Sequence, residues 1–289
     1  MSRSPAASAD ASCGIVGRLR TAGCVFAEDE AQLLIAAART PAELAAMVDA
    51  RAAGRPLEHV LGWVEFCGLR VAVDPGIFVP RRRSELLVRQ AARLAAVAAR
   101  AAPTRNQQGA VVVDMCCGSG AVGLAVAVAV GAPAAAAAGA ASNPVELYAV
   151  DIDPAAVRCA RGNLAAVGGR VYEGHLYEPL PARLRGRVDV LVANVPYVPT
   201  EEIELLPAEA RLHEPRIALD GGADGLEVLR RVTARASRWL VPGGHLLVET
   251  SEGQAAAAVE TFGRGGLVPQ VVSCEELDAT VVIGAWPGS

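Results

Sequence analysis

Lysine is absent from this 289-residue chain, and aromatic side chains make up only 4% of it. All 27 basic residues are therefore arginines, and 31 acidic residues outnumber them, which leaves a formal net charge of -4 at pH 7. A protein that binds nucleic acid over most of its surface carries a large excess of positive charge, so this class is disfavoured. Hydrophobic residues reach 52%, which excludes a chain that is disordered over most of its length.

Cysteine pairs with metal-binding spacing are also missing. The chain has seven cysteines, and no two of them form a C-x-x-C pair. The sequence therefore predicts neither a metal site nor a disulfide framework. Residues 1–12 are small or polar and lack the apolar segment of a secretory signal. We expect a reduced, cytoplasmic protein.

One uncharged stretch, residues 121–141, has the length of a membrane span. It consists mostly of alanine and valine, and a Gly-Ala-Pro sequence at residues 131–133 interrupts it. Alanine contributes little to membrane insertion, so a span is disfavoured. We expect instead a buried helix, followed by an alanine-rich loop at residues 131–142.

The first quarter of the chain differs in pattern from the rest. Residues 12–54 have the spacing of short helices, and Pro41 suits the first turn of one of them. Residues 63–73 alternate between apolar and polar side chains, which predicts a two-stranded hairpin. We therefore expect a helical domain with a hairpin linker over residues 1–75 and a second domain over residues 76–289.

Short apolar runs alternate with helical segments in this second part. The runs lie at residues 111–113, 147–150, 171–172, 188–193 and 245–249. This alternation predicts a Rossmann-like α/β fold with a mostly parallel sheet. The final runs, 268–273 and 279–285, are too close for a helical crossover and should add an antiparallel strand. Ser84 is expected to cap a helix that ends near residue 102.

A glycine-rich loop follows the first of these strands. Gly118, Gly120 and Gly123 satisfy the pattern G-x-G-x-x-G, in which glycines let the backbone approach a ligand closely. Asp114 ends the first strand and Asp151 ends the next, where a carboxylate can accept both hydroxyls of a ribose. The pattern predicts a nucleotide-type ligand, although Asp114 has an alternative role as the cap of the following helix.

The loop Asn194-Val195-Pro196-Tyr197 comes directly after the fourth parallel strand. An amide nitrogen is a poor nucleophile because its lone pair is delocalised. The side-chain carbonyl of Asn194 and the backbone carbonyl of Val195 can each accept one N–H of such a nitrogen. The Tyr197 ring can pack against the flat group and against a sulfonium cation, and Pro196 stiffens the turn. The loop therefore favours methyl transfer to a planar nitrogen.

With these motifs the chain resembles the HemK-type protein-(glutamine-N5) methyltransferases from about Leu57 to the C-terminus. The resemblance implies S-adenosylmethionine as cofactor, S-adenosylhomocysteine as product, and no membrane partner. It implies a peptide-chain release factor as substrate, modified at the glutamine of its Gly-Gly-Gln loop, which the helical domain helps to recognise. The matching segments are Leu61-Gly62, Glu65-Phe66, Gly68-Leu69, Val79-Pro80-Arg81, residues 85–88, the glycine loop, Asp151, residues 194–197 and residues 214–226.

The motifs and the resemblance together give a set of expected site residues. The catalytic set is Asn194, Val195, Pro196 and Tyr197. The cofactor-binding set is Asp114, Cys116, Cys117, Gly118, Ser119, Gly120, Asp151, Ile152, His175, Leu176 and Asn194.

The chain departs from the family pattern in four places. Cys116-Cys117 replaces the usual Gly-Thr of the glycine loop, and His175 stands where the family's Gly-Asp-Leu-Phe has aspartate. The other two departures bear on the substrate. The family's Asn-Pro-Pro-Tyr has Val195 at its second position, and its Pro-Arg-Pro-Glu is Pro80-Arg81-Arg82-Arg83 here. These arginines are expected either to dock an acidic RNA or ribosomal surface or to form a solvated linker. The departures keep other substrates open: a different protein, an amino group of a nucleic acid or a small molecule. A non-catalytic module that binds S-adenosylmethionine and, more distantly, an NAD-dependent oxidoreductase are further alternatives.

Overall fold

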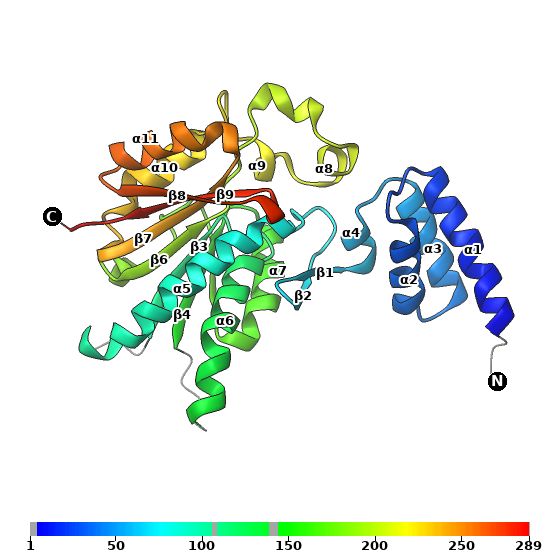
Figure 1. Ribbon diagram of the computed structural model, residues 1–289, viewed down its shortest axis with the longest axis horizontal. Coiled ribbons are helices and arrows are strands. Elements are labelled where there is room, and N and C mark those ends of the chain that lie inside the picture. The colour runs from blue at the N-terminus through cyan, green and yellow to red at the C-terminus, as the bar shows by residue number, and fades with distance from the viewer. Residues whose placement is uncertain (1–4, 106–108, 139–143, 289) are drawn as a thin grey trace.

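The computed structural model describes residues 5–105, 109–138 and 144–288. Figure 1 shows a group of helices at the N-terminus and an α/β part built around one large sheet. A two-stranded antiparallel hairpin lies between them, as predicted.

The N-terminal helices pack around a small core of their own. Leu19 is fully buried in it, and Val48 is almost fully buried. Pro41 begins a helix as predicted, and the side chain of Thr40 caps that helix by accepting a hydrogen bond from the backbone N–H of Glu43. The elements of this part are α1 (Pro5–Thr21), α2 (Ala27–Ala37), α3 (Pro41–Ala52), α4 (Leu57–Leu61), β1 (Trp63–Phe66) and β2 (Leu69–Ala72).

A buried arginine connects these helices to the α/β part. Arg51 of α3 donates from Nε to Glu30 of α2 at 2.6 Å and from Nη1 to Glu209 of α8 (Ala208–His213) at 2.6 Å. Among the residues that the structure describes, Arg51–Glu209 is the one ion pair between α1–α3 and the chain after residue 75. It therefore holds α8 against the helical part.

The large sheet has the strand order β5-β4-β3-β6-β7-β9-β8. The pairs among β5, β4, β3, β6 and β7 are parallel, and β9 runs antiparallel to both β7 and β8. The predicted fold class and the antiparallel end of the sheet are confirmed. The strands are β3 (Ala110–Met115), β4 (Val145–Asp151), β5 (Arg170–Glu173), β6 (Val188–Ala193), β7 (Leu240–Thr250), β8 (Val268–Cys274) and β9 (Ala279–Ala285).

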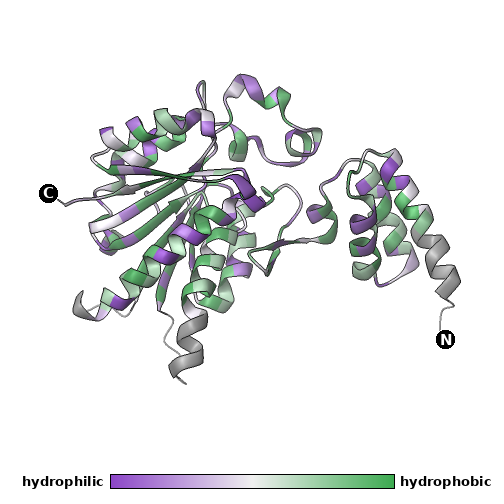
Figure 2. Cartoon of the chain, in the orientation of Figure 1, coloured by the Kyte–Doolittle hydropathy of each residue, from purple (hydrophilic) through white to green (hydrophobic). Residues whose placement is uncertain are grey.

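Helices cover both faces of this sheet. In Figure 2 the strands and the inner helix faces are mostly hydrophobic, whereas hydrophilic residues lie on the outer faces of the helices. One face carries α5 (Glu85–Ala101), α6 (Ala121–Ala138) and α7 (Pro154–Leu164), and the other carries α10 (Glu227–Ala236) and α11 (Ala255–Arg264). The short α9 (Arg216–Leu219) follows α8 in the segment between β6 and β7.

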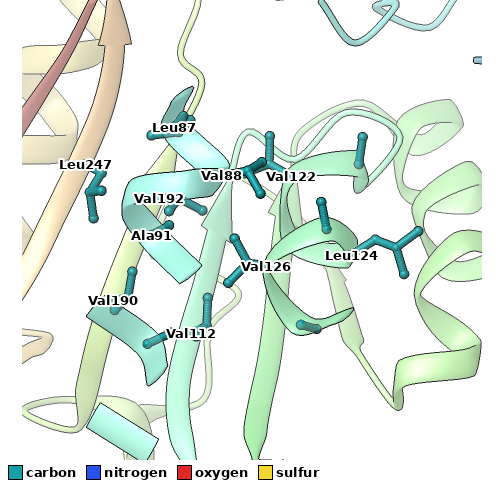
Figure 3. Close-up of a cluster of buried hydrophobic side chains, with 14 of the residues drawn as sticks. Leu87, Val88, Ala91, Val112, Val122, Leu124, Val126, Val190, Val192 and Leu247 are labelled. Atoms are coloured by element: carbon teal, nitrogen blue, oxygen red, sulfur yellow. The ribbon is translucent and has the colours of Figure 1, made fainter. Parts of the chain in front are cut away.

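Helix α5 is anchored on the middle of the sheet. Figure 3 shows its residues Leu87, Val88 and Ala91 beside Val192 of β6 and Leu247 of β7. All five side chains are at most 4% exposed. Burying one leucine or valine contributes about 1.5–3 kcal/mol. This packing fixes the N-terminal end of α5 close to the carboxyl end of β6.

Two local predictions are wrong. The alanine-rich segment was expected to be a loop from residue 131, but α6 continues to Ala138. Inside a helix, glycine costs about 1 kcal/mol and proline about 3 kcal/mol relative to alanine. Alanine has the highest helix propensity of all residues, so the alanines after Pro133 favour the continuation of α6. The last predicted loop residues, 139–142, lie outside the described part.

None of the helices in the described part is long and apolar enough to cross a membrane.

The second wrong prediction concerns Ser84. Helix α5 ends at Ala101, close to the expected position, but the Ser84 side chain makes no capping hydrogen bond. A capping residue needs an extended backbone. Ser84 instead closes a 3₁₀ turn, Arg82–Ser84, and has helical angles, with φ -66° and ψ -8°. Its hydroxyl is therefore available for another contact.

Candidate active site

A cavity of about 580 Å³ opens at the carboxyl ends of β3, β4 and β6. Ligand pockets commonly have volumes of about 300–1,000 Å³. All expected site residues except Gly120 line this cavity. They are Asp114, Cys116, Cys117, Gly118, Ser119, Asp151, Ile152, His175, Leu176, Asn194, Val195, Pro196 and Tyr197.

Backbone hydrogen bonds hold the glycine loop in place. The Cys117 N–H donates to the Val150 carbonyl at 3.0 Å, and the Gly120 N–H donates to the Cys117 carbonyl at 2.7 Å. Gly120 faces α7, where a Cβ would lie 3.1 Å from Leu164 Cγ. Gly120 thus serves the turn and the packing of α7 and does not line the cavity wall.

Asp151 keeps hydrogen-bonding capacity on both carboxylate oxygens. Its Oδ2 accepts from the Gly118 N–H at 2.8 Å, and its Oδ1 accepts from the Asp153 N–H at 2.9 Å. Each oxygen has two lone pairs, so one remains on each for a ligand. Burial raises the pKa of Asp151, against the lowering effect of the backbone N–H groups of Asp153, Gly118 and Ile152. This arrangement suits a pair of neutral hydroxyl donors such as those of a ribose.

Asp114 is the most deeply buried acid of the cavity, at 2% exposed. Its Oδ2 accepts a hydrogen bond from the Gly123 N–H at 2.8 Å, and a Cβ on Gly123 would lie 2.9 Å from that oxygen. Asp114 therefore accepts a hydrogen bond from the first turn of α6, as the capping alternative predicts. It does so from β3 and not from the position directly before the helix. Burial, with an added contribution from the charge of Asp151, raises the pKa of Asp114 to about 8 against the lowering effect of the Gly123 N–H.

The loop after β6 offers two free acceptors. Among the described residues, no group donates to the side-chain carbonyl of Asn194 or to the backbone carbonyl of Val195. The loop is fixed from behind, because Gln254 Nε2 donates to the Tyr197 carbonyl at 2.9 Å. Gly225 packs so closely that a Cβ there would collide with the same carbonyl. The acceptors are therefore presented by a rigid backbone.

The outer wall of the cavity contains the remaining expected residues. Leu176 is buried and has a positive φ of 48°. His175 is partly exposed, and its Nδ1 lies 3.7 Å from Glu178 Oε1. Ile152 is 45% exposed beside them. An apolar and partly open wall of this kind fits a flat ring, but the cofactor roles of these residues stay predictions.

Sequence interpretation missed the ionic contacts of the segment at residues 78–84. Arg81 Nη2 donates to Glu214 Oε1 at 2.5 Å, and Arg83 Nε donates to Glu249 Oε1 at 3.2 Å. Both carboxylates are buried, with side chains 1% and 2% exposed. Arg81 and Arg83 are therefore paired with buried acids and do not form a freely solvated linker, whereas the dock for an acidic RNA or ribosomal surface stays a prediction. Only Arg82, in a loose and exposed pair with Glu276 at 3.6 Å, fits a solvated linker.

Tyr197 belongs to the same ionic group. Its hydroxyl donates to Glu249 Oε1 at 3.5 Å, and the Arg83 guanidinium lies 5.8 Å from the centre of its ring. Burial and the Glu249 carboxylate raise the pKa of Tyr197 to about 12. The phenol is therefore protonated at neutral pH and acts as a packing surface and a donor, not as a base. The one sequence signal for this group was Glu249, an acid at the end of an apolar strand.

Comparisons with known proteins give consistent matches. A family model described as UPF0020, RMKL-like, methyltransferase domain, matches residues 90–204. A release factor glutamine methyltransferase of Geobacter sulfurreducens is 40% identical over 231 residues, which cover 78% of this chain and 72% of the relative. One of Mycolicibacterium smegmatis is 37% identical over 253 residues, covering 86% and 82%. A crystal structure of a methyltransferase from Pyrococcus furiosus matches with 15% identity and a TM-score of 0.47, covering 77% of this chain and 90% of that one.

Replacing Asp114 by asparagine should stabilise the ligand-free protein increasingly as the pH rises from about 4 to about 8. The folded pKa of Asp114 is about 8, above an ordinary value near 3.9. Its stabilising contribution is complete below the ordinary pKa and is lost as the pH rises toward the folded one. Asparagine stays neutral and can still accept from Gly123. Urea unfolding of both proteins at several pH values measures the effect, and a difference that does not change with pH contradicts it.

Arg83→Met should lower the free energy of unfolding by about 1–3 kcal/mol, because it leaves the buried Glu249 carboxylate without its cation. Arg82→Met is the matched control. Arg82 and Glu276 have side chains 73% and 74% exposed, so this change should cost at most about 1 kcal/mol. Chemical unfolding at pH 7 compares the two variants. Equal losses would show that Arg83 contributes no more than a surface charge.

Proposed function

Since the chain belongs to the release factor glutamine methyltransferases, we propose that it transfers a methyl group from S-adenosylmethionine to the side-chain amide nitrogen of a glutamine in a peptide-chain release factor. The glutamine of the Gly-Gly-Gln loop is the proposed acceptor. Such a substrate places the reaction in the cytoplasm, where translation is terminated.

The observation that carries this proposal is the pair of free acceptors on one rigid loop. A primary amide has two N–H groups in one plane, and the carbonyls of Asn194 and Val195 are two acceptors on consecutive residues to which nothing in the described part of the chain donates. A substrate nitrogen held by both has its position and its plane fixed. Such alignment can supply up to about 7–11 kcal/mol. The replacement of proline by Val195 leaves this backbone acceptor in place.

The cavity residues fit the cofactor. S-adenosylmethionine supplies an electrophilic methyl group on a positively charged sulfur, which departs as a neutral thioether. The free lone pairs of Asp151 suit the ribose hydroxyls, and the buried Asp114 suits the ammonium group. Leu176 offers an apolar wall to the adenine. These three residues would hold the cofactor in the cavity that the loop after β6 also lines.

The residues of the loop would then act on the acceptor amide. As the nitrogen gains positive charge, its hydrogen bonds to Asn194 Oδ1 and to the Val195 carbonyl strengthen. The protonated Tyr197 presents its ring to the amide plane and excludes water from it. The methyl–sulfur bond breaks as the methyl–nitrogen bond forms, and the methylated nitrogen, now a strongly acidic cation, then gives up one of its two protons to solvent. Since the leaving group departs readily, positioning by these groups accounts for the rate, and no nucleophilic side chain is required.

We infer a division of labour between the two parts of the chain. Residues 76–289 would bind the cofactor and carry out the transfer, and residues 1–75 would contact the protein substrate. Pro56 and Glu209 support this division, because both line the cavity where the helical part meets α8. A release factor would thus insert its loop between the two parts.

Asn194→Ala should lower methylation of the release factor at least about 100-fold, the usual cost of removing a group that stabilises developing charge. Mass spectrometry of the Gly-Gly-Gln peptide after incubation with enzyme and S-adenosylmethionine measures it. A release factor with glutamine replaced by glutamate is the acceptor control, and calorimetry should still detect cofactor binding. Full activity of the variant would overturn the role of Asn194. Methylation of RNA or another protein in place of the release factor would overturn the proposed substrate.

Binding of S-adenosylmethionine near pH 7 should release close to one proton from the wild-type protein. Asp114, with a pKa of about 8, is mostly protonated when the site is free, and the cofactor's ammonium group favours the ionised form. Calorimetry in buffers of different ionisation enthalpy counts the protons. Asp114→Asn should abolish the release and weaken binding. Equal proton release by both proteins would exclude Asp114 as the partner of the ammonium group.

A further inference from the structure

A serine hydroxyl outside the expected site contacts the proposed catalytic asparagine. Ser84 is 1% exposed and lines the cavity at the N-terminal end of α5. Asn194 Nδ2 donates to Ser84 Oγ at 3.3 Å. Among the described residues this is the one hydrogen bond of the Asn194 side chain. Ser84 lies 110 residues before Asn194 in the sequence, so neither motif predicts the contact.

The support of this serine is rigid. The Ser84 N–H donates to the Arg81 carbonyl at 2.9 Å, and both neighbouring arginines of the turn, Arg81 and Arg83, are tied to buried carboxylates. On the other side, α5 packs on the sheet through Leu87 and Ala91, which lie beside Val192 of β6 (Figure 3). The Ser84 hydroxyl is thus held in place near the carboxyl end of β6, the strand that directly precedes Asn194.

The orientation of the Asn194 carboxamide matters because its two ends are chemically opposite. One end is an NH₂ donor and the other is a carbonyl acceptor, and the two have nearly the same shape. With the carbonyl toward the cavity, Asn194 accepts an N–H of the substrate amide. After a half-turn about the last side-chain bond, two NH₂ groups would face each other and the substrate nitrogen would be repelled.

We propose that Ser84 is the positioning residue that anchors the Asn194 carboxamide at its Nδ2 end. Because a serine hydroxyl can also donate, the N–H groups of the substrate, which need a carbonyl, decide against the reversed carboxamide. Its Oγ accepts from Nδ2, which leaves Oδ1 toward the substrate. Ser84 acts through Asn194 and does not touch the reacting atoms. This inference rests on the proposed function, because it assigns Asn194 Oδ1 to a substrate N–H.

The kinetic test compares Ser84→Ala with Ser84→Thr. Alanine removes the hydroxyl, so a share of Asn194 side chains rotates and kcat should fall about three- to tenfold, the worth of one hydrogen bond. The KM for the release factor and the affinity for S-adenosylmethionine should stay within twofold. Threonine keeps a hydroxyl and should restore most of kcat. A rise in KM with unchanged kcat, or a loss that threonine does not restore, would overturn the proposal.

A spectroscopic test needs no acceptor and separates this inference from the proposed function. The chain contains four asparagines, so selective ¹⁵N-asparagine labelling gives four side-chain NH₂ signals, and Asn194→Asp identifies the one of Asn194. Ser84→Ala should shift that signal. Asn163 is the internal control, since its Nδ2 donates to the carbonyls of Ala72 and Ser119 at 2.9 and 2.8 Å and should not change. An unchanged Asn194 signal would overturn the positioning role even if the wild-type enzyme methylates release factors.

Discussion

Two buried carboxylates, Glu214 between α8 and α9 and Glu249 near the end of β7, hold the segment before α5 in place, and Glu249 also accepts from Tyr197 of the loop after β6. A buried charge is costly unless an opposite charge and hydrogen bonds compensate it, and Arg81 and Arg83 provide that compensation. The segment cannot move away without exposing or stranding both acids. The positions of Ser84, of Tyr197 and thus of the proposed acceptors depend on this constraint.

The acids on the cofactor side of the cavity have the opposite character. Asp114 and Asp151 lie near each other with backbone N–H groups as partners, and no cationic side chain in the described part of the chain pairs with either, so burial raises the pKa of both. A ligand that brings hydroxyl donors and a positive charge would relieve this unfavourable arrangement. Functional sites often keep such destabilised groups, because the binding of the ligand provides the compensation that the free protein lacks.

The departures of the chain from its family acquire a physical meaning in the structure. The extra arginine at position 83, where the family has glutamate, is not a free positive charge, because Glu249 neutralises it and Tyr197 packs beside it. The altered motif therefore packs beside the proposed catalytic loop, and its Arg81 and Arg83 are both paired with acids in the described part of the chain. The second departure, Val195, contributes through a backbone carbonyl that any residue supplies.

The sequence by itself determined the features that depend on neighbouring residues. The apolar run of β6, the glycine loop and the turn at residues 194–197 follow from local patterns, because periodicity and turn chemistry act over a few positions. Only the tertiary structure decided which distant side chains meet. Ser84 and Asn194 are 110 residues apart, and Arg83 and Glu249 are 166 apart. Such contacts arise when α5 packs on the sheet, and no spacing along the chain encodes that packing.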